Sequence, residues 1–196
     1  MIKLGITGGI SSGKSTAANY LASKESTYVF NADRESKKHL KSSSSLQNKL
    51  INVFSNKITV NKKLDLNLLA KEAFSDSINH KILNGIMWPE ISTLINHSYN
   101  TAKEQKYKLF IVDAALIFEA NFMFFFDKII LISTNKPKRI ERAIQRANLS
   151  LENIQNRIYL QMPESKKKKL ADIVIYNNGN INNLYNKLDK LYLELF

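Results

Sequence analysis

The sequence has no cysteine, and it has few residues that interrupt regular structure, with six glycines and three prolines in 196 residues. The lack of cysteine excludes a disulfide framework, a thiol nucleophile and a cysteine-based metal site. No hydrophobic stretch approaches the length of a membrane span. The opening residues, MIKLGITGG, already form an apolar strand pattern and a glycine loop, which leaves no room for a signal peptide. We therefore expect a cytoplasmic protein without membrane association.

Acidic residues are also scarce, since 17 Asp and Glu stand against 29 Lys and Arg and leave a net charge of +12. Such an excess is typical of a nucleic-acid-binding protein or of one whose small substrate carries several phosphates. The lysines are spread along the chain, and the one dense block, at 166–169, is interpreted as a solvated helix face. Charge alone does not decide between the two partners. Together with the motifs below, it leads us to expect a small-molecule substrate and no nucleic acid.

A phosphate-binding motif stands near the start of the chain. The segment GGISSGKS, residues 8–15, matches G-x-x-x-x-G-K-[ST] without a mismatch. Ile2, Leu4 and Ile6 precede it as a short apolar run, and apolar residues follow it at helical spacing. A strand at 2–7, a loop and a helix from Lys14 form the context in which this motif binds phosphate. The alternative is a glycine turn with a serine N-cap and no ligand. It is less favoured, because such a turn requires neither the lysine nor this spacing.

The motif assigns a task to each of its positions. Glycines let backbone N–H groups turn toward a polyphosphate, and the helix N-terminus adds its positive dipole end. Lys14 is expected to reach the β- and γ-phosphates of a nucleoside triphosphate, and the Ser15 hydroxyl to coordinate Mg²⁺. The residues of this segment predicted to bind ATP are Gly9, Ser11, Ser12, Gly13, Lys14, Ser15 and Thr16.

Apolar segments alternate with helical patterns along the rest of the chain, which predicts an α/β fold with a parallel sheet. Further strands are expected within 27–33, ending near Asn31 or Asp33, at about 109–113 and at 127–134. Residues 171–179 are expected to form a last strand and a turn, and an amphipathic helix follows at the C-terminus. We expect a single P-loop NTPase-type domain over 1–196, an open parallel sheet flanked by helices. Its core covers 1–33 and 105–196, a helical substrate lobe without a convincing strand covers 34–104, and a helical lid covers 136–165.

Two carboxylates follow predicted strands, where the ligands of an open α/β sheet bind. Asp33 follows YVFNA and is a candidate base for the hydroxyl group that accepts a phosphoryl group. Asp113 follows LFIV and is a candidate Walker-B-like ligand of Mg²⁺, directly or through water. Capping of the next helix is the alternative role for each of them.

Arginines are rare beside lysines, and three of them share one predicted helix. RIERAIQR places Arg139, Arg142 and Arg146 at spacings of three and four, on one side of that helix. Guanidinium groups in such a row suit a lid that closes over a transferring phosphate and excludes water. A solvated face that includes Glu141 is the alternative.

Five motifs, in order over nearly the whole chain, resemble those of the dephospho-CoA kinase family. They are GITGGISSGKST, NADRESKK, DAALIFEA, RIERAIQR followed by Gln161, and ADIVIYNNG. The resemblance implies ATP-dependent phosphorylation of the ribose 3′-hydroxyl of dephospho-CoA, the last step of coenzyme A biosynthesis. Together with the motif at 8–15, it implies ATP and Mg²⁺ as cofactors. We also expect a monomer or weak homo-oligomer.

The resemblance also implies roles for individual residues. Asp33 matches the second aspartate of an Asp-Ala-Asp motif and would act as the base. Arg142 would stabilise the transferring phosphoryl group, supported by Arg139 or Arg146. Asn178 and Gly179 would lie beside the adenine. The residues that would bind the substrate are Asp33, Lys37 and Glu119.

Three positions depart from the family pattern. Asn31 replaces the first aspartate of Asp-Ala-Asp, Trp88 replaces the histidine of a His-Pro pair, and Ala115 replaces the proline of Pro-Leu-Leu-Phe-Glu. These positions predict a divergent family member.

Other functions remain open at this level. Another small-molecule P-loop kinase, for nucleosides, nucleotides or a sugar, would share the loop. A GTPase would need Asn-Lys-x-Asp, but Asn135 and Lys136 are followed by Lys138 at the fourth position. A nucleic-acid-dependent ATPase would need more chain than this. The aromatic run at 121–127 is interpreted as packing rather than as a pantetheine contact, and the three histidines lack metal-ligand spacing.

Overall fold

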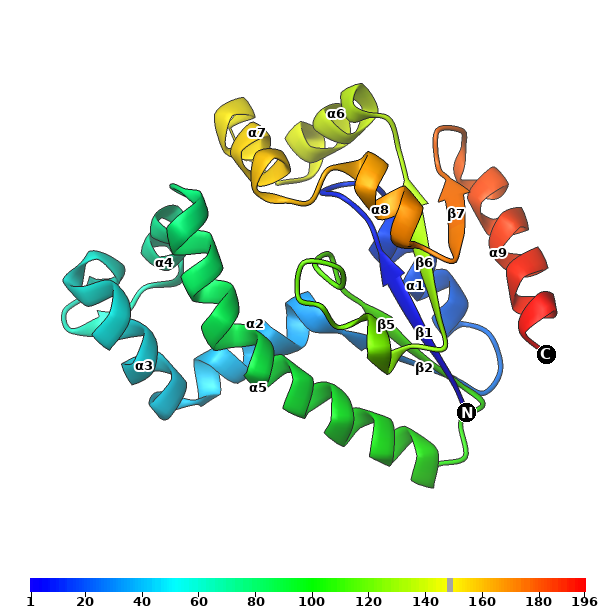
Figure 1. Ribbon diagram of the computed structural model, residues 1–196, viewed down its shortest axis with the longest axis horizontal. Helices are drawn as coiled ribbons and strands as arrows, with labels where there is room; N and C mark the ends of the chain where they lie inside the picture. Colours follow the sequence, from blue (N-terminus) through cyan, green and yellow to red (C-terminus); the bar gives the residue numbers. More distant parts are fainter. Residues whose placement is uncertain (148–149) are drawn as a thin grey trace. The chain divides into compact units, whose positions relative to one another are not determined.

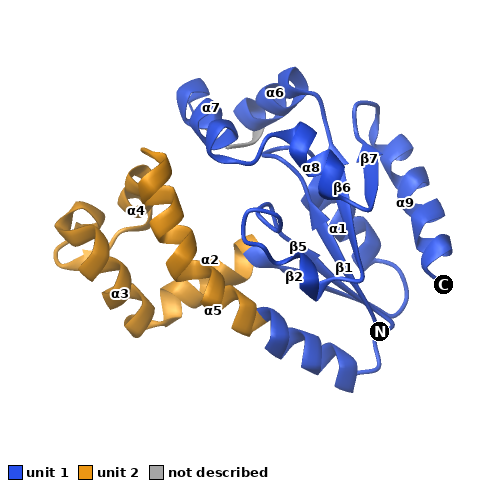
Figure 2. Ribbon diagram, viewed as in Figure 1, with its two compact units in different colours: residues 1–32, 95–196 blue, residues 33–94 orange. Residues whose placement is uncertain are grey.

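The computed structural model describes residues 1–147 and 150–196, without the side chains of Arg146 and Ala147. The chain forms two compact units (Figure 2), of which one comprises Met1–Ala32 with Ile95–Phe196 and the other Asp33–Leu94. Helix α5, Ser77–Glu104, contributes residues to both units.

The larger unit is built on a five-stranded sheet with the strand order β2-β5-β1-β6-β7 (Figure 1). Its strands are β1 Ile2–Thr7, β2 Thr27–Asn31, β5 Leu109–Asp113, β6 Lys128–Ser133 and β7 Ile173–Tyr176. All neighbouring strands pair in parallel, so their carboxyl ends lie at one edge of the sheet. The loop after the central strand β1 opens at this edge, where ligands of such sheets bind. The predicted parallel α/β sheet is confirmed.

Helices α1, Lys14–Ala22, and α9, Ile181–Leu195, contribute to the hydrophobic core of the sheet. Leu184, Leu188 and Leu191 of α9 recur at spacings of four and three, which places them on one face of the helix. All five residues of β5 are buried, as expected for a strand covered on both faces. The core residues are Leu4, Ile6, Ala17, Ala18, Leu21, Leu109, Ile111, Ile130, Ile132, Ile175, Leu184, Leu188 and Leu191.

Three helices follow β6 where the lid was predicted. They are α6 Lys136–Ala147, α7 Leu151–Leu160 and α8 Glu164–Leu170. Ser150 begins α7 as its N-cap, because its hydroxyl accepts a hydrogen bond from the Asn153 N–H at 3.2 Å. The chain then returns to the sheet as β7.

The aromatic run forms the short 3₁₀ helix η2, Met123–Phe125, and the turns beside it. Phe122 is buried and stacks on Phe125 with 5.2 Å between ring centroids. Phe125 in turn meets Phe110 of β5 edge to face at 6.4 Å. Packing is therefore the role of these two rings, whereas Phe124 is 83% exposed.

The smaller unit is helical. It contains α2 Ala32–Ser42 from Asp33 onward, α3 Ser44–Phe54, the 3₁₀ helix η1 Ser55–Ile58, α4 Leu66–Ala73 and the first part of α5. It also contains a hairpin of β3 Thr59–Val60 and β4 Lys63–Leu64, although the sequence had predicted no strand in this region. Asn61 and Lys62 both have positive φ, as in a type I′ turn, and two-residue strands are too short to show an alternating pattern.

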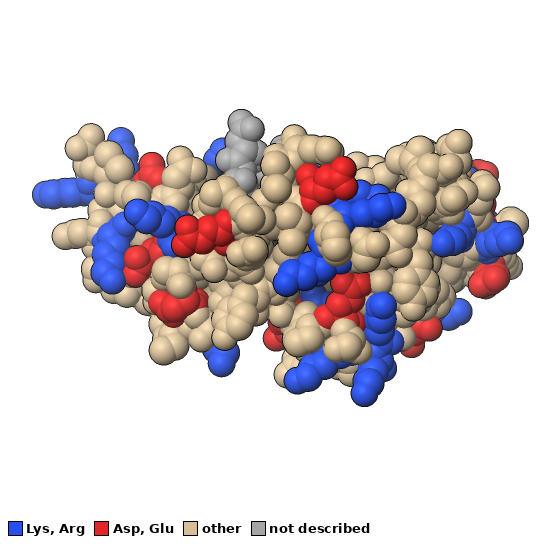
Figure 3. All heavy atoms as spheres, turned by 90° about the horizontal axis from the view of Figure 1, so that it is seen from above, with Lys and Arg blue, Asp and Glu red and all other residues tan. Residues whose placement is uncertain are grey.

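No helix in the described part of the chain has both the length and the apolar character needed to cross a bilayer. On the face drawn in Figure 3, Lys and Arg side chains stand among Asp and Glu side chains rather than forming one continuous basic field. The excess of positive charge is thus interspersed with acidic groups on this face.

Candidate active site

The loop between β1 and α1 has the backbone of a phosphate-binding cradle. Ser11 has φ of 56° and Gly13 has φ of 97°, and the Ser12 N–H donates to the Gly9 carbonyl at 3.1 Å. Gly13 precedes α1 without a side-chain cap, which leaves the first N–H groups of this helix to a bound anion. The predicted loop residues are Gly9, Ser11, Ser12 and Gly13, and Lys14, Ser15 and Thr16 begin α1.

Lys14 is buried beside a carboxylate at the end of β5. Its Nζ lies 3.0 Å from Asp113 Oδ1, and Asn31 Nδ2 donates to Asp113 Oδ2 at 2.6 Å. Asp113 is fully buried, and these two partners each contact one of its carboxylate oxygens. An aspartate at position 31 would set a second carboxylate against Asp113, and Asn31 supplies a donor instead. Turns rather than a helix follow Asp113, which excludes helix capping as its role.

Mg²⁺ prefers oxygen ligands and usually keeps several waters beside one or two protein oxygens and the phosphates of a substrate. Ser15, the second residue of α1, and Asp113, the last residue of β5, both carry side-chain oxygens, and Asp113 already contacts Lys14 and Asn31. No group of three or more acidic, histidine or cysteine side chains that could hold a metal occurs among the described residues. The oxygens of Ser15 and Asp113 fit a Mg²⁺ that binds together with the phosphates of a nucleotide.

The Ser12 hydroxyl gives a second sign of a ligand site. Its oxygen is buried and has no hydrogen-bond partner within the described structure. A buried polar group of this kind is usually satisfied by a ligand or by water. The loop backbone and this hydroxyl fit a bound polyphosphate.

Gly13 has no room for a side chain. Its φ of 97° costs an L-residue about 1–2 kcal/mol, and a Cβ would overlap the Asn177 side-chain amide. We expect Gly13→Ala to weaken ATP binding at least about tenfold, the equivalent of about 1.4 kcal/mol. Calorimetric titration with Mg·ATP measures the effect. Gly85→Ala is the matched control, because a Cβ at Gly85 meets nothing within 4 Å. Equal affinities for the two variants would contradict this prediction.

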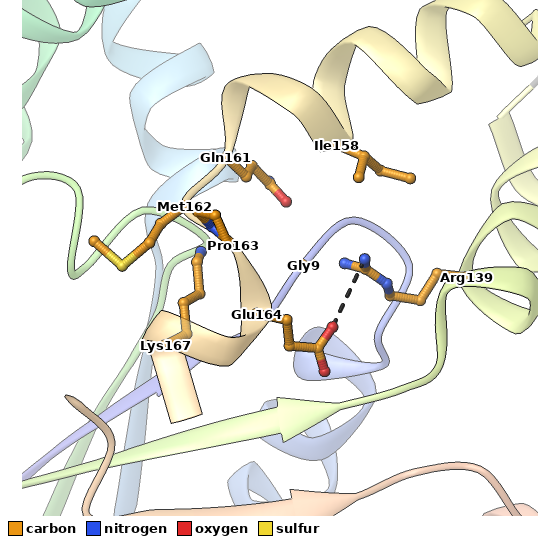
Figure 4. A pocket seen from close by; sticks show the side chains of 8 residues that line it. All are labelled: Gly9, Arg139, Ile158, Gln161, Met162, Pro163, Glu164 and Lys167. Carbon is orange, nitrogen blue, oxygen red and sulfur yellow. Dashed lines mark ion pairs between the residues drawn. The ribbon is translucent and has the colours of Figure 1, made fainter. Parts of the chain in front are cut away.

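Arg139 of α6 and Gln161, at the end of α7, lie directly over the loop (Figure 4). A Cβ at Gly9 would overlap Nη1 of Arg139, and Gln161 Oε1 accepts a hydrogen bond from the Ile10 N–H at 3.2 Å. Arg139 Nη2 lies 3.7 Å from Glu164 Oε2, the ion pair drawn in Figure 4. These groups line a cavity of about 50 Å³, into which the side chains of Arg139 and Gln161 point.

Arg142 of α6 contacts the turn that follows β7. Its Nη2 donates to the Asn177 carbonyl at 3.3 Å. Asn178 Oδ1 accepts from the Asn135 N–H at 2.9 Å, and the Asn178 carbonyl accepts from Lys138 Nζ, which fixes the turn that contains Gly179. Arg146 belongs to α6, but its side chain lies outside the described residues.

Asp33 and Lys37 belong to the smaller unit. Asp33 lies in the first turn of α2, two residues after the end of β2, and its side chain is exposed. It follows the first helical residue, Ala32, so it does not occupy the N-cap position, although its charge suits the helix N-terminus. Lys37 lies one turn further along and is also exposed.

Glu119 contacts a lysine that the sequence interpretation had placed on a solvated face. Lys167 is 1% exposed, and its Nζ lies 2.8 Å from Glu119 Oε1 and donates to the Ala115 carbonyl at 2.9 Å. Glu119 Oε1 also accepts from the Met162 N–H at 2.8 Å. Burial lowers the pKa of the Lys167 ammonium, and the Glu119 carboxylate opposes that shift. The solvated-face interpretation is thus wrong for Lys167, and a run of four lysines gives no signal that singles out the buried one.

Sequence analysis also missed Thr134 and Asn177, which are both buried against the loop. Their position directly after β6 and β7 is the signal that could have found them, since polar residues there lie at the same sheet edge as the loop.

A phosphate-binding loop after the central strand of a parallel sheet, with a buried lysine at its end and arginines on the helix that follows β6, defines a P-loop kinase. A family model described as dephospho-CoA kinase matches residues 2–183. A dephospho-CoA kinase of Fusobacterium nucleatum is 35% identical over 189 residues, which cover 95% of each chain. The chain belongs to the dephospho-CoA kinase family and is a phosphotransferase.

Solved structures share the fold of this chain. A protein of Thermus thermophilus, TT1252, matches all of this chain and 98% of its own with 29% identity and a TM-score of 0.82. A dephospho-CoA kinase of Campylobacter jejuni matches 98% of this chain and 96% of its own with 27% identity and a TM-score of 0.59.

Proposed function

We propose that this protein transfers the γ-phosphoryl group of ATP to the ribose 3′-hydroxyl of dephospho-CoA, which yields CoA and ADP. The observation that carries the proposal is the loop at residues 8–15, whose Lys14 is buried beside Asp113 at the carboxyl edge of the sheet. Family membership supplies the acceptor, and the loop supplies the phosphate chemistry.

Each chemical task has a candidate residue in this chain. Asp33 accepts the proton of the attacking hydroxyl, and its exposed side chain in the first turn of α2 is accessible to an acceptor. Lys14 and the N–H groups of the loop bind the β- and γ-phosphates. Arg142 balances the charge on the transferring group, with Arg139 and Arg146 in support. Mg²⁺, held by Ser15, the phosphates and, directly or through water, Asp113, would supply charge neutralisation.

Arg139 covers Gly9 and is 7% exposed, so its side chain shields this part of the loop. Exclusion of water favours transfer to the substrate hydroxyl over hydrolysis of ATP. This arrangement supports 136–165 as the lid of the enzyme.

The remaining candidate residues would bind the adenine of ATP and the acceptor, dephospho-CoA. Asn178 and Gly179 form the turn that would lie beside the adenine of ATP. Lys37 would contact an anionic group of dephospho-CoA as a point charge. Glu119 would also bind dephospho-CoA. The helical region 34–104 would accept dephospho-CoA. We also propose that the protein is cytoplasmic, acts as a monomer or weak homo-oligomer, and takes no nucleic acid.

A panel of acceptors tests the substrate. Dephospho-CoA, adenosine, AMP and shikimate are compared at equal concentration with Mg·ATP, and ADP release is followed. We expect kcat/KM for dephospho-CoA to exceed that for the others at least about 100-fold, as a site built for one acceptor achieves. A better rate with another acceptor would leave the kinase class in place and overturn the substrate.

A further inference from the structure

The carbonyl group of Ser12, inside the phosphate-binding loop, is held by two buried side chains. Thr134 Oγ1 and Asn177 Nδ2 each lie 2.9 Å from this oxygen. Thr134 is fully buried and Asn177 is 8% exposed. Both follow strands of the sheet, β6 and β7, so the rigid edge of the sheet fixes the loop at this peptide group.

This contact sets the direction of a neighbouring N–H group. The Ser12 carbonyl and the Gly13 N–H belong to one planar trans peptide unit, in which the two bonds point in opposite directions. When Thr134 and Asn177 hold the oxygen on the sheet side, the Gly13 N–H points away from them. The Gly13 N–H then joins the N–H groups at the start of α1, which form the anion-binding end of this helix.

Of the two donors to the Ser12 carbonyl, Thr134 is also close to a second acceptor, whereas Asn177 is not. A threonine hydroxyl carries a single proton, yet Thr134 Oγ1 lies within hydrogen-bond distance of both the Ser12 and the Asn177 carbonyl oxygens, at 2.9 and 3.1 Å. The amide of Asn177 donates to the Ser12 carbonyl. Its own N–H donates to the Ser133 carbonyl at 2.8 Å, which continues the β6–β7 pairing.

Asn177 also contacts the lid. Its carbonyl accepts the hydrogen bond from Arg142 Nη2 at 3.3 Å. The same residue thus touches the loop through its side chain and an arginine of α6 through its backbone. Replacement of the side chain removes the first contact and leaves the second in place.

We propose that Asn177 is a positioning residue for polyphosphate binding, whose side-chain amide aligns the Gly13 N–H with the phosphate chain of ATP. The proposal rests on the proposed function only in taking the ligand of the loop to be a polyphosphate. Asn177 acts through the loop and does not itself touch the nucleotide.

The test measures binding of two probes, Mg·ATP and inorganic tripolyphosphate with Mg²⁺, by calorimetry. Asn177→Ala is expected to weaken the binding of both about tenfold to a hundredfold, since the buried Ser12 carbonyl loses its unshared donor. Asn177→Asp keeps the shape but turns an acceptor toward the carbonyl, and we expect a loss at least as large. It serves as the second variant should Asn177→Ala unfold.

Asn180→Ala is the matched control. Asn180 is the N-cap of α9, and its Oδ1 accepts from the Asn183 N–H at 2.9 Å. This variant lowers the melting temperature by loss of a cap in the same turn region, but we expect it to leave both affinities unchanged. A purely structural role for Asn177 predicts the opposite, namely that affinity follows melting temperature in all variants.

Three results would overturn the proposal: unchanged tripolyphosphate binding in both Asn177 variants, an equal loss in Asn180→Ala, or no binding of tripolyphosphate by the wild type. If the Asn177 variants lost affinity for ATP but not for tripolyphosphate, Asn177 would act on the nucleoside part of ATP rather than on the phosphates, which is the first of these results. CoA formation by the wild type, measured alongside, reports separately on the proposed function, because binding to the loop does not depend on the acceptor.

Discussion

Asp33→Asn is expected to lower kcat for CoA formation by about 10²–10⁴-fold, the usual contribution of a positioned base. The amide has the shape of the carboxylate but does not accept the proton of the acceptor hydroxyl. Asp33 is exposed in the first turn of α2, so the fold tolerates the change, with a cost of about 0.3–1 kcal/mol from the helix dipole. Steady-state kinetics give kcat, and calorimetry with Mg·ATP should show unchanged affinity.

Glu35→Gln is the control for this variant. Glu35 is the other acidic residue in the first turn of α2, and it pairs with Arg34 at 2.9 Å. The control changes the charge of the same helix end by the same amount, and we expect kcat to remain near the wild-type value. Full activity of Asp33→Asn would remove Asp33 as the base and leave the overall reaction in place.

Lys167→Met is expected to destabilise the protein by about 3–5 kcal/mol, the cost of breaking a buried ion pair on one side. The variant would leave Glu119 without its cation, while Glu119 Oε2 is already buried without a hydrogen-bond partner in the described structure. Urea unfolding measures the free energy of unfolding. Because Glu119 Oε1 also accepts a hydrogen bond from the Met162 N–H, between α7 and α8 and beside the phosphate-binding loop, activity should fall as well.

Two further variants isolate the pair. Lys169→Met removes an exposed lysine from the same run, and we expect a change within about 0.5 kcal/mol. The double variant Lys167→Met with Glu119→Gln removes both charges and should recover much of the stability lost in Lys167→Met. If Lys167→Met proves as stable as Lys169→Met, the buried pair contributes nothing and this account of Glu119 is wrong.

The lowered pKa of Lys167 gives the pair a pH signature. Burial disfavours the ammonium in the folded state, so the unfolded chain holds this proton to higher pH than the folded one. Stability from this group therefore rises with pH between the lowered pKa and the ordinary lysine value. The difference in unfolding free energy between the wild type and Lys167→Met should grow across that alkaline range. A constant difference would contradict the shift.

The parallel sheet could be predicted from the sequence, because each of its strands shows a pattern within a few consecutive residues. Strands such as 109–113 are continuous apolar runs, and the motif at 8–15 marks the turn between β1 and α1. The hairpin of β3 and β4 was missed because two-residue strands leave no pattern. Its turn, Asn61–Lys62, is recognisable only from the backbone.

Site residues could be predicted from the sequence only where they occupy a position of a recognisable motif. Lys14 was expected from its motif, whereas its contact with Asp113 depends on the pairing of β1 with β5. Lys167 and Asn177 have roles set by tertiary burial, which neither composition nor spacing reveals. The role of Asp113 toward Mg²⁺ stays a prediction.

The most direct measurement is the product of one incubation with ATP, Mg²⁺ and dephospho-CoA, identified by mass and by phosphorus NMR. We expect CoA and ADP in equal amounts, with the new phosphate on the ribose 3′-oxygen. Absence of CoA from a preparation that binds ATP, or a phosphate on another oxygen, would contradict the assigned reaction.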